Sequence, residues 1–256
     1  MIDVTELFRN GDWAAINEII RGSSKTGRNT MRIVKPTFEI LDPAPFDRNA
    51  GLYLYRKIER AARTCYRSED LMTEDSSTRM VKMLVERGHE AMLEHADVSV
   101  RFIVDRGITH ELVRYRHCSF AQESTRYCNY VKDKFGGEIS YIPLEEQLEQ
   151  YDLNENQIDE IARIWTCACA DAEVYYNEMI QVGAPPEIAR SVLNHSTASS
   201  IVVKTNLREW RHIFMERAVG IHGKAHPEIH MVMVRLLSAF NECMPEVFGD
   251  IWTWGE

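Results

Sequence analysis

The chain has 256 residues, of which 45% are hydrophobic and 27% are charged, and its formal net charge is -9. A globule of this length buries enough surface to fold without disulfides or a structural metal, which excludes the small stapled domains. No run of about 18 apolar residues is present, and the N-terminus lacks the basic-then-apolar pattern of a signal peptide. We therefore expect a soluble, cytoplasmic protein with no membrane partner, whose six cysteines are reduced thiols.

The first half of the chain predicts a short extension followed by strands and helices. Within residues 1–30, one apolar helical face is followed by a stretch with the composition of a linker, so we place the folded domain at residues 31–256. The periodicity and capping residues predict a strand over 32–40, helices over 50–64 and 77–87, a strand over 98–104, and a short helix over 109–116.

The second half predicts mainly helices. An irregular polar and aromatic stretch is expected up to Tyr130. Beyond it the pattern predicts a helix over 155–182, a second helix starting near Glu187, a strand over 199–205, a helix from the cap Asn206 to Ala218, and a last helix over 227–243. Few strands and many helices, without strict alternation, predict an α+β fold that is mainly helical with a modest antiparallel sheet.

Charge is distributed unevenly along the chain. Residues 143–187 have a net charge of -10, which is typical of a solvated helix face, whereas residues 101–134 have a net charge of +3. In a chain that is acidic overall, a local group of arginines favours a small phosphate ligand over a nucleic-acid polymer, whose binding needs many neutralised phosphates.

The segment 114–127 concentrates the polar chemistry, with three arginines and two serines among its fourteen residues. Serine hydroxyls and exposed backbone N–H groups can donate to phosphate oxygens while arginine forks neutralise them. A basic loop that forms salt bridges with the acidic helices explains the same pattern, and spacing alone leaves both explanations open. No glycine-rich dinucleotide motif or P-loop is present.

The same segment resembles a family signature. The two arginines of Arg114-x-Arg116, followed after seven residues by Ser124, are similar to the signature of the flavin-dependent thymidylate synthases (the ThyX family). Ser119, Gln122, Arg126 and Tyr127 are similar to the extended form of that motif. Blocks at 60–63, 88–95, 187–190, 205–208 and 216–218 resemble further family blocks in the same order.

The chain departs from the family pattern in three places. Tyr115 stands where the signature usually has histidine, the stretch 219–226 is a few residues longer than usual, and residues 1–30 have no counterpart. The resemblance implies a fold like that of the thymidylate synthase complementing proteins, spanning residues 31–256. It also implies a homotetramer whose active sites are shared between subunits.

The activity implied by the resemblance is the methylation of dUMP to dTMP. Methylenetetrahydrofolate would donate the one-carbon unit, bound FAD would carry the hydride, NADPH would be the reductant, and no cysteine nucleophile would be needed. Arg217 would be catalytic, with its guanidinium near N3 of uracil, where it stabilises the anionic ring.

The resemblance also implies two sets of binding residues, by matching position. The dUMP set is Glu111, Arg114, Gln122, Glu123, Ser124, Thr125, Arg126, Arg190 and Arg217. The FAD set is His89, Glu94, Arg114, Tyr115, Arg116, Gln122, Asn206, Leu207, Arg208 and His212. Arg208 and His212 are four residues apart and can share one face of a helix.

Two other functions remain compatible with the sequence. One is a metal-dependent phosphate-ester hydrolase, because His222, His226 and His230 recur every four residues; however, Pro227 is expected to begin the helix there and to leave His222 outside it. The other is a nucleotide sensor that has kept the arginine loop and lost turnover, which the replacement at Tyr115 would fit. The main hypothesis involves no metal site.

Overall fold

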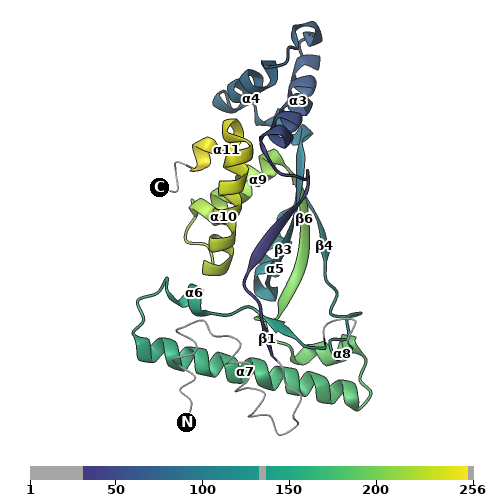
Figure 1. Ribbon diagram of the computed structural model, residues 1–256, viewed down its shortest axis with the longest axis vertical. Helices are drawn as coiled ribbons and strands as arrows, with labels where there is room; N and C mark the ends of the chain where they lie inside the picture. Colours follow the sequence, from purple (N-terminus) through teal and green to yellow (C-terminus); the bar gives the residue numbers. More distant parts are fainter. Residues whose placement is uncertain (1–30, 133–136, 253–256) are drawn as a thin grey trace. The chain divides into compact units, whose positions relative to one another are not determined.

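The computed structural model describes residues 31–132 and 137–252, so the expected extension over residues 1–30 lies outside the described residues. The described chain forms two compact units (Figure 1). Unit 1 comprises the chain up to Pro36 with the segments Ile103–His110 and Gln122–Ser200, and unit 2 comprises Thr37–Phe102, Glu111–Ala121 and Ile201–Glu256. The single domain expected over residues 31–256 stays a prediction.

A four-stranded sheet has the order β2-β3-β6-β4. Its strands are β2 (Thr37–Asp42), β3 (Asp97–Asp105), β6 (Ala198–Asn206) and β4 (Cys118–Gln122). Strands β3 and β4 each begin in unit 2 and end in unit 1. Strand β6 begins in unit 1 and ends in unit 2, and β2 begins directly after the first segment of unit 1. Neighbouring strands therefore run in opposite directions, and the predicted antiparallel sheet is confirmed.

Unit 2 packs five helices around an aromatic core. They are α3 (Arg48–Thr64), α4 (Ser76–Glu86), α9 (Leu207–Phe214), α10 (Pro227–Cys243) and α11 (Pro245–Trp252). Two 3-10 turns, η1 (Glu69–Leu71) and η2 (Glu90–His95), and the π-helical turn η5 (Met215–Val219) complete the unit. Trp210, Phe214, Phe240 and Phe248 are fully buried, with neighbouring ring centroids 5.1 to 5.7 Å apart. Such contacts contribute packing energy beyond the area they bury.

Unit 1 is organised by one long helix, α7 (Glu155–Gln181). Asn154 begins it with a capping box: the Asn154 side chain accepts from the Gln157 N–H, and the Gln157 side chain accepts from the Asn154 N–H. The core includes Tyr141, Trp165 and Tyr176. Its other elements are the parallel pair β1 (Arg32–Ile33) and β5 (Ser140–Tyr141), the short helices α6 (Glu145–Leu148) and α8 (Pro186–Ala189), and the 3-10 turn η4 (Arg190–Val192).

Several predicted elements need correction. The strand expected over 32–40 is two strands, because the chain leaves β1 at Ile33 and resumes only at Thr37, after Pro36. The helix expected over 109–116 is α5 (Arg106–Leu112), and the stretch expected to be irregular contains β4. The helix expected from Glu187 is only α8 followed by η4. β5, α6 and α11 were not predicted, since each is short or lacks a periodic apolar pattern.

The remaining long elements agree with the predictions. α10 begins at Pro227 as expected, and Asn206 caps α9, with its side chain accepting from the Glu209 N–H at 2.9 Å. The helix expected to reach Ala218 is α9 continued by η5, which ends at Gly220 in the left-handed conformation (φ 78°). Among the described residues no helix is long and apolar enough to span a membrane.

Candidate active site

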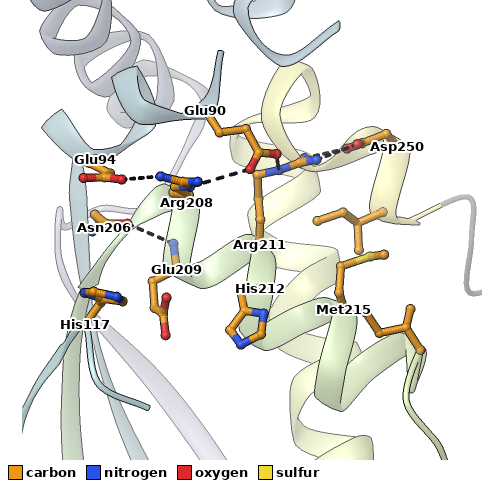
Figure 2. Close-up of a pocket in the computed structure, with 12 residues that line it drawn as sticks. Glu90, Glu94, His117, Asn206, Arg208, Glu209, Arg211, His212, Met215 and Asp250 are labelled. Carbon is orange, nitrogen blue, oxygen red and sulfur yellow. Dashed lines mark hydrogen bonds and ion pairs between the residues drawn. The ribbon is translucent and has the colours of Figure 1, made fainter. Parts of the chain in front are cut away.

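A cavity of about 690 Å³ lies in unit 2 (Figure 2), which is a volume typical of small-molecule sites. The turn η2, the start of α9 and the end of α11 provide most of its polar groups. The residues that line it are Glu90, Glu94, His117, Asn206, Arg208, Glu209, Arg211, His212, Met215, Ile221, Asp250 and Ile251. Four residues of the expected FAD set, namely Glu94, Asn206, Arg208 and His212, therefore lie together.

Helix α9 orients the groups at the centre of this cavity. Leu207, Trp210 and Ile213 are fully buried on its core side. Because residues three and four apart share a helix face, this burial turns Arg208 and His212 toward the cavity. Two residues from one motif therefore line one site because the opposite face of α9 is apolar.

Carboxylates hold both arginines of the cavity (Figure 2). Arg208 donates to Glu94 at 2.6 Å and lies 3.8 Å from Glu90. Arg211 contacts Asp250 at 2.7 Å and Glu90 at 3.2 Å, and it also donates to the carbonyl oxygen of Val247. Burial alone would raise the pKa of Asp250, but the bonds from Arg211 hold it below its ordinary value. The hydrogen bond to Glu94 raises the pKa of Arg208 above its ordinary value.

Arg217 lies in the π-helical turn and is held by two residues of the segment 111–116. Its Nε donates to the hydroxyl of Tyr115 at 2.9 Å, and its Nη1 lies 2.8 Å from a carboxylate oxygen of Glu111. The ring of Tyr115 in turn meets the ring of His212 edge-on, with centroids 5.8 Å apart. Burial raises the pKa of Tyr115 although Arg217 opposes the shift, so the hydroxyl stays protonated at neutral pH. The expected catalytic arginine is thus linked through Tyr115 to the cavity.

The other residues expected to bind FAD are placed differently. His89 precedes η2, Leu207 is buried in the core, and Arg114 and Arg116 are exposed in the turn between α5 and β4. Gln122 belongs to unit 1, where its amide donates to the hydroxyls of Thr109 at 2.8 Å and Ser199 at 3.2 Å. None of these five is among the residues that line the cavity.

The residues expected to bind dUMP through a loop lie in unit 1. Arg190, which belongs to a separate motif, donates to the hydroxyl of Thr125 at 3.2 Å, so tertiary contact joins it to the segment 122–126. Glu123 accepts from the hydroxyl of Tyr130 at 2.6 Å. Burial, reinforced by Glu123, raises the pKa of Tyr130. Arg126 pairs with Glu187 at 2.8 Å, so the salt-bridge explanation for the basic loop applies to this arginine.

Comparison with known proteins decides the family. Residues 55–246, three quarters of the chain, match the model of the thymidylate synthase complementing protein family. The chain belongs to this family.

Curated relatives and a solved structure agree with this assignment. The flavin-dependent thymidylate synthase of Corynebacterium efficiens is 33% identical over 211 residues, covering 75% of this chain and 78% of the relative. The enzyme of the same name from Mycolicibacterium vanbaalenii is 31% identical over 227 residues, covering 85% and 87%. The crystal structure of the UMP/dUMP methylase PolB from Streptomyces cacaoi, bound with 5-Br dUMP, matches with a TM-score of 0.70 at 21% identity, over 87% of this chain and 97% of that one. The first two confirm the resemblance seen in the signature, and the third confirms the fold.

The histidine-rich segment of this family member does not gather into a cluster. His226 caps α10 by accepting from the Glu228 N–H, His230 contacts the carbonyl oxygen of Arg217, and His222 pairs with Glu216. Within residues 31–132 and 137–252 no group of three His, Cys, Asp or Glu side chains could hold a metal ion. Nothing in the described chain supports the hydrolase hypothesis.

Sequence reasoning missed several residues of the cavity, among them His117, Glu209, Arg211 and Asp250. Arg211 carries a usable signal, since it is three residues from Arg208 and could have been placed near it on α9. His117 directly follows the signature arginines. Asp250 and Glu209 give no sequence signal that distinguishes them from other surface acids.

Proposed function

We propose that the chain is a flavin-dependent thymidylate synthase that converts dUMP to dTMP. The observation that carries the proposal is the contact between two separate family motifs beside one cavity. Arg208 and His212 of the block near residue 206 line it, and Tyr115 of the signature packs against His212 and binds Arg217. Membership of the family and the names of its curated relatives support the same activity.

The cavity suits a flavin dinucleotide. Arg208 is half exposed and keeps guanidinium N–H groups that can donate to an anionic group, while the rings of His117 and His212 and the amide of Asn206 offer planar and hydrogen-bonding surface. Bound flavin supplies hydride transfer, and the protein supplies orientation and electrostatics. We assign Glu94, Asn206, Arg208 and His212 to holding it, and His89, Arg114, Tyr115, Arg116, Gln122 and Leu207 stay predicted contacts.

Arg217 stabilises the negative charge that develops on the uracil ring. C5 of uracil is a poor nucleophile, so activation requires a cation or donor placed where charge accumulates. The contacts from Arg217 to Tyr115 and Glu111 engage two of its three guanidinium nitrogens and fix its orientation, which leaves other N–H groups to donate.

Arg190 and the segment 122–126 bind the nucleotide in this proposal. Arg190 is exposed, and within the described residues its side chain has only the Thr125 hydroxyl as a partner, so its charge is available to a phosphate. NADPH is the reductant and methylenetetrahydrofolate the one-carbon donor. The working enzyme is a homotetramer in the cytoplasm whose subunits share their active sites.

The cysteines provide the test of this function. Cys118 lies in the signature segment and Cys128 directly follows it, and these two are the candidates for a thiolate that attacks C6 of uracil. Burial raises the pKa of the Cys118 thiol to about 11, so it is protonated at neutral pH and is a poor nucleophile. A Cys118→Ala, Cys128→Ala double variant should therefore still form dTMP from dUMP when FAD, NADPH and methylenetetrahydrofolate are supplied.

The measurement combines product analysis with the absorption spectrum of the purified protein, where bound flavin gives bands at roughly 370 and 450 nm. Loss of turnover in a variant that still folds and binds FAD and dUMP would contradict a thiol-free mechanism. Turnover without flavin would contradict the proposed enzyme class. Wild-type protein that binds both ligands without forming product would instead be a nucleotide sensor.

A further inference from the structure

Glu209 is a buried carboxylate for which the described chain provides no partner. The residue is only 9% exposed and lines the cavity, where Figure 2 shows its side chain between His117 and His212. Its backbone is fixed, since its N–H donates to the Asn206 side chain at 2.9 Å. No hydrogen bond or ion pair to its carboxylate occurs among the described residues.

The cations nearest in sequence are already engaged with other acids. Arg208 turns to Glu94, and Arg211 turns to Asp250 and Glu90. A carboxylate on the cavity lining keeps its hydrogen bonds to water only while the cavity is open, and a ligand that fills the cavity must replace them, because an unreplaced bond costs free energy. Since the oxygens of Glu209 face the cavity, the donors that compensate it must come from what occupies that cavity.

The chemistry of a carboxylate limits which group can occupy this place. It repels phosphate, and it accepts hydrogen bonds from two adjacent hydroxyls, which is how acidic residues recognise the sugar of a dinucleotide in other folds. We propose that Glu209 binds a vicinal pair of hydroxyl groups of the flavin dinucleotide, either on the ribityl chain or on the ribose of its adenosine half. This inference rests on the proposed function, and it makes Glu209 a binding residue that selects the sugar portions of the cofactor.

Flavins of different length test the inference. Dissociation constants of FAD, FMN and lumiflavin, which lacks all sugar hydroxyls, are measured by fluorescence titration of the flavin-free full chain. Glu209→Leu should weaken FAD binding at least 10-fold and leave lumiflavin binding unchanged, because lumiflavin has no sugar hydroxyls to lose. Glu209→Gln keeps one acceptor oxygen and should weaken FAD by a smaller factor of about 3. Glu242→Gln, an exposed acid on α10 that does not line the cavity, is the matched control and should bind all three flavins normally.

The comparison of FAD with FMN separates the two sources of hydroxyls. An equal loss for both places the contact on the ribityl chain, and a loss for FAD alone places it on the ribose. Unchanged FAD affinity in both variants, or an equal loss for all three flavins, would overturn the inference while leaving the proposed function intact. If Glu209→Leu does not fold, the Glu209→Gln titration decides by the same criteria. Wild-type protein that binds no flavin would overturn the proposed function itself.

Discussion

Arg190 of unit 1 differs in its partners from the three arginines at or near the cavity of unit 2. In unit 2, Arg208, Arg211 and Arg217 each contact at least one carboxylate within 2.8 Å. In unit 1, Arg126 and Arg163 also pair with carboxylates, whereas Arg190 reaches only the neutral hydroxyl of Thr125 among the described residues. A paired arginine is held in one orientation, whereas an unpaired one keeps its net charge for a ligand.

Individual buried acids also differ in their partners. Glu59 is fully buried and one of its oxygens pairs with Arg63 at 2.7 Å, although its other oxygen has no hydrogen-bond partner in the described chain. Glu173 and Glu145 in unit 1 each have an oxygen that is buried without a hydrogen-bond partner, and burial raises the pKa of both to about 7. The charge of Glu59 is thus balanced by a neighbouring cation, whereas no cation pairs with Glu173 among the described residues.

The difference between the paired arginines and Arg190 agrees with the roles proposed for them. Fixed arginines suit a site that must place one donor against a ring, because orientation matters more there than total charge. An uncompensated arginine suits the recognition of a phosphate dianion, whose binding draws on net charge.

The largest expected effect comes from breaking the fixed geometry at Arg217. Arg217→Lys should lower turnover on dUMP by about 10²-fold or more, because a single ammonium cannot keep the bonds to Tyr115 and Glu111 while also donating to uracil. The measurement is steady-state kinetics together with flavin content, which should be nearly unchanged.

Arg235→Lys is the matched control, since Arg235 is exposed on α10 and outside the cavity lining. Its turnover should equal that of the wild type. Normal turnover in Arg217→Lys would remove Arg217 from the catalytic role.

Removing the uncompensated charge at Arg190 should have the next largest effect. Arg190→Ala should weaken dUMP binding by about 1.5 to 3 kcal/mol, or roughly 10- to 150-fold, as expected for the loss of a charged hydrogen bond. Calorimetric titration of the flavin-loaded protein measures this directly.

The control Arg163→Ala removes an exposed arginine of α7 that pairs with Glu160, and dUMP affinity should not change. If Arg190→Ala instead lost flavin at unaltered dUMP affinity, the division of roles between the two units would be wrong.

Glu173 gives the smallest effect, on stability. Its pKa is about 7 in the folded chain against an ordinary 4.5, because burial disfavours the charged form. Between these values the folded protein keeps a proton that the unfolded chain releases, so the free energy of unfolding falls as pH rises. Glu173→Gln should remove this loss and raise stability at pH 8 by at most about 3 kcal/mol relative to the wild type.

Denaturant unfolding of both proteins at pH 5 and pH 8 checks the prediction. Glu178→Gln, an exposed position on the same helix, should match the free energy of unfolding of the wild type at both pH values. Glu145, whose pKa is also raised, should contribute equally to the pH dependence of stability in every variant. Equal differences at the two pH values would show that Glu173 ionises freely in the folded state.

The sequence predicted the elements that local physics controls. The cap at Asn206, the start of α10 at Pro227 and the length of α7 follow from side chains adjacent to the helix ends and from a strong apolar period, so they needed no tertiary information. β4 was missed because its five residues form part of a polar motif, and a short strand is stabilised by its neighbours in the sheet.

The sequence by itself also determined the family, because the signature arginines and serine resemble the family motif and residues 55–246 match the family model. Only the tertiary structure decided which residues share a cavity. Asp250 reaches Arg211 from a helix thirty-nine residues away, and within the described residues Glu209 has no partner, since both neighbouring arginines turn to other acids. Contacts between distant segments depend on packing, and local propensity carries no information about them.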